Sequence, residues 1–114
     1  MDEQTQDIKI SYEDFQKIDL RVAEIIEAAE HPNADRLFVL KIKIGEETRQ
    51  IVAGIRASYK KEELIGRKIA VITNLQPAVI RGQESCGMLL AASGENGPII
   101  LTPEKDVPSG SKIK

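Results

Sequence analysis

An alternating stretch at residues 37–44, LFVLKIKI, is the feature that most limits how this chain folds. Its apolar side consists of Phe38, Leu40, Ile42 and Ile44. Lys41 and Lys43 fall on the opposite side, and this two-residue period predicts a strand with one buried and one solvated face. Gly45-Glu46-Glu47 then form a turn, and the β-branched residues of 48–54 complete a predicted hairpin.

Further short strands are expected after this hairpin, and their order limits the fold. The predicted strands are KIAVIT (68–73), GMLLAAS (87–93) and PIIL (98–101). Before them, Ser58 is expected to cap a short helix over residues 59–65, which Gly66 ends. Short strands with one helix between the third and the fourth match the OB-fold, a five-stranded, partly open barrel that binds oligonucleotides and oligosaccharides.

Residues 20–30, LRVAEIIEAAE, fit two interpretations. Val22, Ile25, Ile26 and Ala29 have the spacing of an amphipathic helix. As a strand, the segment needs a bulge near residues 23–25, where its inward-facing parity changes. The pattern alone leaves both open, and the HPNAD sequence at 31–35 ends either element.

The N-terminus predicts a tail followed by one domain. Residues 1–10 lack an apolar period and are expected to be a flexible tail, while 11–114 form the domain. Ser11 is expected to cap a short helix with Tyr12, Phe15 and Ile18 on one face. Because the N-terminus is acidic and no apolar run is long enough to span a bilayer, we expect a cytoplasmic protein with no membrane partner.

Composition excludes several classes of function. One cysteine and one histidine cannot supply a tetrahedral zinc site, so no metal is expected. The sequence has no glycine-rich phosphate motif and no nucleophile arrangement. We therefore expect no cofactor and no catalytic activity. A net charge of −2 argues against coating nucleic acid by bulk electrostatics, so any nucleic-acid site must be local.

The segment 74–93 is typical of a binding loop carried by a strand. Asn74, Arg81 and Ser85 are expected to offer hydrogen-bond donors outward. Arg81 is followed by glycine, which permits close backbone approach to phosphate oxygens. Taken alone, Asn74 and Ser85 are better explained as turn residues, whereas Arg81 fits a solvated loop arginine as well as a phosphate contact. Met88 begins an apolar strand and is expected in the core, although a thioether at the mouth of a barrel can also pack on a splayed base.

Three sequence blocks carry a family resemblance. They are DLRVAEIIEAAEHPNADRLFVLKI (19–42), RQIVAGIRASYKKEELIGRKIAVITNLQP (49–77) and RGQESCGMLLAA (81–92). Together they resemble the tRNA-binding domain family. This module is appended to many methionyl-tRNA synthetases. Because the chain contains little else, it is similar to the free-standing form or to a separately encoded β subunit.

The resemblance implies an all-β OB-fold, a five-stranded Greek-key barrel in which 20–30 is a long bent strand. It also implies a homodimer formed by the N- and C-terminal extensions, which suits the apolar face of the first helix and the apolar residues 99–101. Its implied role is a non-catalytic accessory subunit that supplies tRNA to methionyl-tRNA synthetase. The alternative is a homodimeric, chaperone-like peptide-binding protein of the same family.

Carried over by position, the implied tRNA contacts are Arg36, Arg56, Asn74, Arg81, Ser85 and Met88. The chain departs from many relatives at Ala78 and Val79, where basic residues are common. This departure predicts either that tRNA is bound more weakly, or that Arg81 and the face with Lys41 and Lys43 contribute more of the binding.

Overall fold

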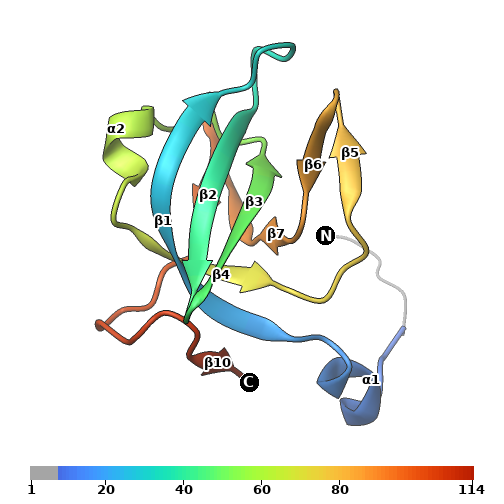
Figure 1. The fold of residues 1–114 in the computed structure, drawn as a ribbon. Helices are drawn as coiled ribbons and strands as arrows, with labels where there is room; N and C mark the ends of the chain where they lie inside the picture. The colour runs from blue at the N-terminus through green and yellow to red at the C-terminus, as the bar shows by residue number, and fades with distance from the viewer. Residues whose placement is uncertain (1–7) are drawn as a thin grey trace.

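The computed structural model describes residues 8–114, and its centre is a sheet curled into a half-barrel (Figure 1). Most of the predicted 1–10 tail therefore lies outside the described residues. The main strands are β1 (Leu20–Glu30), β2 (Phe38–Ile44), β3 (Glu47–Ala53), β4 (Lys68–Ile72) and β7 (Met88–Leu89). They are ordered β3-β2-β1-β4-β7, and β10 (Lys112–Ile113) pairs with the start of β1. The expectation of a mainly β, OB-like barrel is confirmed.

The long first strand resolves the ambiguity of residues 20–30. Its first half pairs with β4 and its second half with β2, so one strand belongs to both sides of the barrel. The register with β2 shifts between Ile25 and Glu27, close to the expected bulge. The helical spacing of this segment is therefore misleading. Ala23 and Ile25 alternate into the core as strand residues do, whereas Val22 is buried on the other side, where it is hydrogen-bonded to Gly110 and Ser111.

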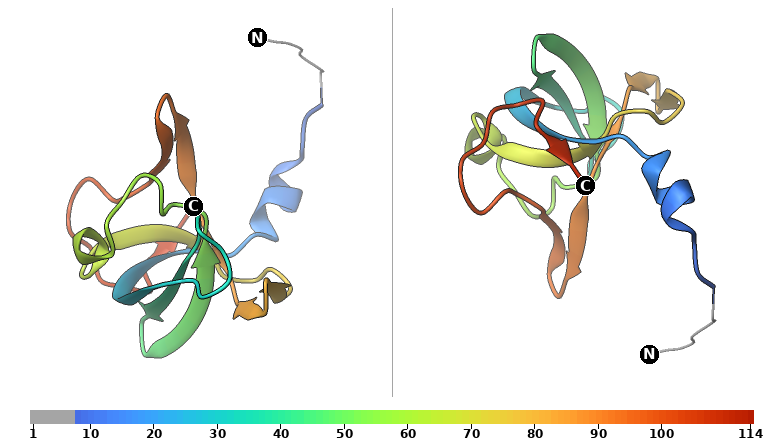
Figure 2. Two further views of the ribbon diagram at one scale, coloured as in Figure 1. Left: turned by 90° about the horizontal axis from the view of Figure 1, so that it is seen from above. Right: turned by 90° about the horizontal axis from the view of Figure 1, so that it is seen from below.

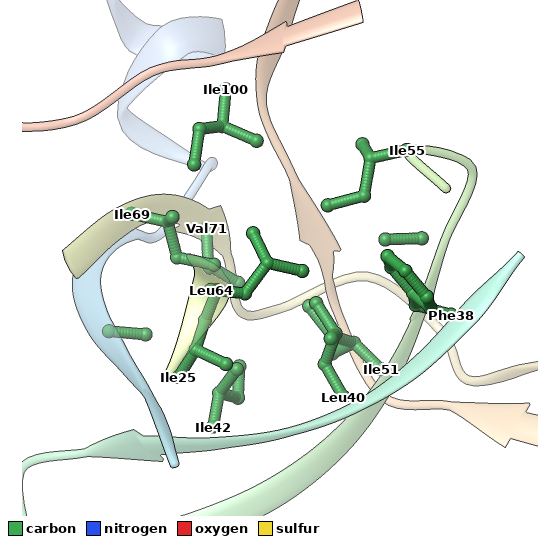
Figure 3. Close-up of a cluster of buried hydrophobic side chains, with 12 residues drawn as sticks. Ile25, Phe38, Leu40, Ile42, Ile51, Ile55, Leu64, Ile69, Val71 and Ile100 are labelled. Atoms are coloured by element: carbon green, nitrogen blue, oxygen red, sulfur yellow. The ribbon is translucent and has the colours of Figure 1, made fainter. Parts of the chain in front are cut away.

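The core lies inside the curl of the sheet and follows the alternation of β2. Phe38, Leu40 and Ile42 are at most 2% exposed and point toward side chains of β3 and β4 (Figure 3). Gly45 turns β2 into β3 with a φ of 62°, a conformation that favours glycine. The predicted hairpin is confirmed, with every β2 residue paired to β3.

Two strand predictions need correction. The predicted strand 87–93 is divided into β7 and β8 (Ala91–Gly94), because the Leu90 amide bonds Ala70 while its carbonyl bonds Leu101. β8 pairs with β9 (Gly97–Ile100) in a separate hairpin. The predicted 74–87 loop contains another hairpin, β5 (Ala78–Ile80) and β6 (Gln83–Ser85).

The two helices lie at opposite ends of the molecule (Figure 1). Helix α1 (Tyr12–Gln16) is capped as predicted, since Ser11 Oγ accepts from the Asp14 amide at 3.0 Å. It has no buried residue and stands clear of the barrel (Figure 2). Within residues 8–114, no helix is both long and apolar enough to cross a membrane.

Helix α2 (Lys61–Leu64) begins later than expected and covers β1. Its cap is Lys60 rather than Ser58, because the Glu63 carboxylate accepts from the Lys60 amide at 2.7 Å. Gly66 ends it as predicted, with a φ of 88° and an amide that bonds the Ile25 carbonyl at 2.8 Å. Leu64 is fully buried in the core.

We expect Leu64→Ala to lower the free energy of unfolding by about 2–5 kcal/mol, because it opens a cavity under α2. The adjacent Ile65→Ala is the matched control, since Ile65 is 51% exposed, and it should cost about 1 kcal/mol or less. Urea denaturation measures both. Equal losses for the two variants would show that α2 is not seated as described.

Candidate nucleic-acid interface

The loop 31–37, between β1 and β2, lies beside the β5–β6 hairpin (Figure 1). His31, only 3% exposed, joins them. Its Nδ1 accepts from the Asn33 amide at 2.9 Å, so its Nε2 bears the proton and donates to the Ile80 carbonyl at 3.0 Å. His31 thus links the two loops through hydrogen bonds to both.

Three of the predicted contact residues, Arg36, Arg56 and Arg81, come together around the loop 31–37. We refer to them as the arginine cluster. Arg81 donates to the Asn33 carbonyl at 3.2 Å, and Arg56 donates to the neighbouring Ala34 carbonyl at 3.4 Å. The backbone amide of Arg56 also bonds the Arg36 carbonyl at 3.4 Å. Residues 36, 56 and 81 are far apart in sequence, so the fold itself assembles this positive cluster.

Members of the arginine cluster differ in how free their guanidinium groups are. Arg56 is 28% exposed and lies 3.5 Å from the Glu30 carboxylate. Arg36 is exposed and has no side-chain hydrogen bond or ion pair within residues 8–114. Arg36 and Arg81 are therefore the more available partners for an anion.

Arg81 occupies a conformation that costs free energy. It is the one non-glycine residue with positive φ, 52°, in the described chain, and Gly82 follows with 88°. Positive φ at both central positions matches the type I′ turn of two-residue hairpins, where Asn and Gly are preferred. Arginine there costs about 1–2 kcal/mol. The turn places its guanidinium at the hairpin tip, and such strain is typical of functional positions.

Asn74 is not directed outward as expected. Although exposed, its side chain accepts from the Asp19 amide at 2.8 Å and donates to the Lys17 carbonyl at 2.6 Å. Asn74 therefore ties the start of the loop 73–87 to the segment that follows α1. Next to it, Thr73 donates to Asp19, and this hydrogen bond, aided by Arg21, holds the pKa of Asp19 below its usual value despite the opposite effect of burial.

Ser85 also turns inward and is 5% exposed. Its hydroxyl accepts from the Val52 amide at 2.9 Å and donates to the Gly87 carbonyl at 3.0 Å. The hydrogen bond with Val52 closes the barrel, because it joins the edge of β3 to the end of the hairpin, and the bond to Gly87 fixes the backbone that follows β6. A buried hydroxyl with these partners positions the loop and does not itself face a ligand.

Met88, by contrast, is 47% exposed. It lies on β7 opposite Ile72 and does not belong to the core. Leu75 and Val79 are further exposed apolar side chains of the loop 73–87, with Val79 72% exposed. This part of the surface is therefore apolar.

Arg49 is a residue that sequence reasoning missed. Its guanidinium donates to the Thr73 carbonyl at 2.6 Å and to the Cys86 carbonyl at 3.2 Å, so one side chain holds both ends of the loop. Glu47 orients it from 2.7 Å, and that bond lowers the pKa of Glu47. The only signal was an arginine on a predicted strand next to a turn, which is too common to single out.

A hollow of about 460 Å³ lies between the loop 31–37 and the hairpin tip. Arg36 and Arg81 line it together with apolar and carboxylate side chains of the same two loops. Among residues 8–114 no group of three or more His, Cys, Asp or Glu side chains could hold a metal ion. The site is thus a rigid, partly apolar concavity with guanidinium groups at its rim, which defines a binding module.

Comparison with known proteins gives the family of this module. Residues 20–112 match the family described as "Putative tRNA binding domain". A methionine–tRNA ligase of Caldanaerobacter subterraneus is 53% identical over 113 residues, which are 96% of this chain and 18% of that relative. The chain belongs to the tRNA-binding domain family, and it spans only 14–18% of the length of such ligases.

Two solved structures share the fold over nearly their full length. The methionyl-tRNA synthetase-related protein of Pyrococcus horikoshii has a TM-score of 0.87 at 30% identity, with 94% of this chain and 99% of that chain covered. The chaperone CsaA of Bacillus anthracis has a TM-score of 0.85 at 30% identity, with 94% and 100% covered. The same architecture therefore occurs in a synthetase-related protein and in a protein named as a chaperone.

We expect Ser85→Ala to destabilise the fold by about 1–3 kcal/mol, because it leaves the buried Val52 amide without a partner. Ser93→Ala on the exposed β8 is the control and should change stability by less than about 0.5 kcal/mol. Chemical denaturation measures the difference. A neutral Ser85→Ala would contradict the role of this hydroxyl in closing the barrel.

Proposed function

We propose that this chain is a non-catalytic module that binds tRNA through the arginine cluster and the β5–β6 hairpin. The observation that supports it is the convergence of Arg36, Arg56 and Arg81 on one rigid loop, in a chain that belongs to the tRNA-binding domain family. The guanidinium fork matches phosphate oxygens in a bidentate manner. A net negative protein that binds a polyanion needs its cations gathered in one place, as they are here.

Recognition in this proposal depends on the contour of folded tRNA rather than on the anticodon. Arg36, Arg56 and Arg81 contact the sugar-phosphate backbone, and Met88 packs on an exposed base or ribose. Asn74 and Ser85 support these contacts indirectly, since both side chains are bonded within the protein. The hydrogen bonds of His31 hold the two loops together before binding, so less conformational entropy is lost when tRNA binds.

We further propose that the chain acts in trans as the accessory β subunit of methionyl-tRNA synthetase in the cytoplasm. The relatives named methionine–tRNA ligase support an association with that enzyme, because each contains a segment similar to this chain. Bringing tRNA close to a catalytic partner raises its apparent affinity through local concentration, by ~10²-fold or more. The catalytic step belongs to that partner.

A homodimer is part of the proposal. Tyr12 on α1 is 71% exposed and Ile18, which follows α1, is 37% exposed. Ile99 on β9 and Leu101 just after it are 49% and 44% exposed. These apolar side chains are suited to cover one another between two copies. Ile100, which the sequence placed with them, is 6% exposed and packs in the core, so it is not available.

The second candidate is a chaperone-like peptide-binding dimer. The exposed Leu75 and Val79 favour it, as does the structural similarity to a protein named as a chaperone. The arginine cluster has no evident part in binding apolar segments. Suppression of the aggregation of a denatured protein, together with no retention of tRNA, would place this function first.

Filter binding with total tRNA, single-stranded RNA and duplex DNA tests the leading proposal. We expect tRNA to be retained at concentrations that leave duplex DNA unbound, because the site is fixed in shape and recognises a folded RNA surface. Equal retention of all three would indicate generic binding of polyanions. No retention of tRNA would exclude the proposed function.

We expect Arg81→Asn to weaken tRNA binding by roughly 10- to 100-fold, because a charge-assisted bond is lost. The slope of log affinity against log salt should fall by ~0.7–0.9, the value of one phosphate contact. Asparagine suits the positive φ of this turn, so stability should stay the same or rise. Affinity at several salt concentrations and thermal unfolding measure both effects.

Arg67→Asn is the control for charge, since Arg67 is exposed next to α2, away from the arginine cluster. It should alter affinity by no more than a few-fold. An unchanged salt slope for Arg81→Asn would remove Arg81 from the interface.

A further inference from the structure

The hollow beside the hairpin tip has an unusual wall for a phosphate site. Its lining combines Arg36 and Arg81 with the carboxylate of Asp35 and with Leu37 and Ile80. A carboxylate repels phosphate, and apolar side chains offer phosphate nothing. The hollow therefore suits a neutral, flat group with hydrogen-bond donors at its edge better than it suits a phosphate.

Asp35 does not serve to hold the arginines in place. The structure gives it no hydrogen bond or ion pair with any other residue of 8–114, although Arg36 is its neighbour. Arg56 pairs with Glu30 instead, and Arg81 binds the Asn33 carbonyl. The Asp35 side chain is exposed, and both of its oxygens remain able to accept.

We propose that this hollow holds one unpaired guanine of the bound RNA, with the Asp35 carboxylate accepting from the N1–H and the N2 amino group of the base. The inference rests on the proposed RNA-binding function and assigns a base to the same site. Leu37 and Ile80 contact the face of the base, and Arg81 or Arg36 holds the adjoining phosphate or stacks on the ring.

Guanine is favoured over the other bases by its pattern of donors. Its Watson–Crick edge offers two adjacent N–H groups, which match the two oxygens of one carboxylate. Adenine, cytosine and uracil each present an acceptor beside a donor, and that acceptor would face a carboxylate oxygen. The volume of about 460 Å³ falls within the ~300–1,000 Å³ typical of small-ligand sites.

The site is also held in shape without a ligand. His31 fixes the start of the loop to Ile80, and Arg81 bridges to Asn33 at 3.2 Å. These contacts join the two walls of the hollow, so a base enters a site whose geometry is already set.

The test uses the RNA heptamers UUUGUUU and UUUAUUU with the full chain, measured by fluorescence anisotropy. Wild type should bind the guanine heptamer about 10-fold more tightly, the discrimination typical of one good bidentate pair. Asp35→Asn should abolish this preference and favour the adenine heptamer, because an amide offers one donor and one acceptor. A merely structural role for Asp35 would not exchange the preferred base.

Glu95→Gln is the matched control, because it removes the same charge from the β8–β9 hairpin, which projects away from the β5–β6 hairpin (Figure 2). It should leave the guanine preference unchanged. Retention of total tRNA by wild type is measured in parallel.

The outcomes separate the two proposals. If tRNA is retained but the heptamers bind equally or not at all, the guanine site is overturned while RNA binding stands. A guanine preference that survives Asp35→Asn also overturns it. If wild type does not retain tRNA, the proposed function fails and the guanine site fails with it.

Discussion

Closure of the free edge of β3 is the constraint on which the rest of this structure depends. β3 is the last strand of the main sheet, and an open edge would leave its amides unpaired. The end of the loop 73–87 covers this edge. The Ser85 hydroxyl accepts a hydrogen bond from the Val52 amide, and the Cys86 amide donates to the Gln50 carbonyl. Arg49 then holds both ends of the same loop.

This closure also creates the candidate interface. A loop anchored at both ends holds the β5–β6 hairpin upright, and the hairpin tip meets the loop 31–37 through His31 and Arg81. Asn74 and Ser85, whose side chains are hydrogen-bonded within the protein, therefore help to set the shape of the candidate interface. They act through geometry, whereas Arg36 and Arg81 supply charge at the surface.

Part of this arrangement could be predicted from sequence. The alternation of residues 37–44 and the glycines at 45 and 66 determine local structure directly, and the structure confirms them. The bent strand 20–30 required the family resemblance, because its bulge mimics a helical period. The β5–β6 hairpin escaped prediction, since strands of three residues are too short to display a period.

Which polar side chains face outward was beyond the sequence. Ser85 and Asn74 look like ligand-binding residues of a loop, and only tertiary contacts with Val52, Asp19 and Lys17 show that they are internally bonded. Ile100 was likewise grouped with exposed neighbours, but it packs in the core. The family resemblance pointed to each residue of the arginine cluster separately. Only the fold shows that the three side chains lie together.

The measurement that tests this account most directly is an NMR titration of the labelled protein with tRNA, following the backbone amides. We predict that the shifts concentrate at residues 33–37 and 79–83, with α2 and the β8–β9 hairpin unaffected. Shifts confined to α2 or to the β8–β9 hairpin would contradict the account. So would binding of tRNA that leaves the amides of residues 33–37 and 79–83 unshifted.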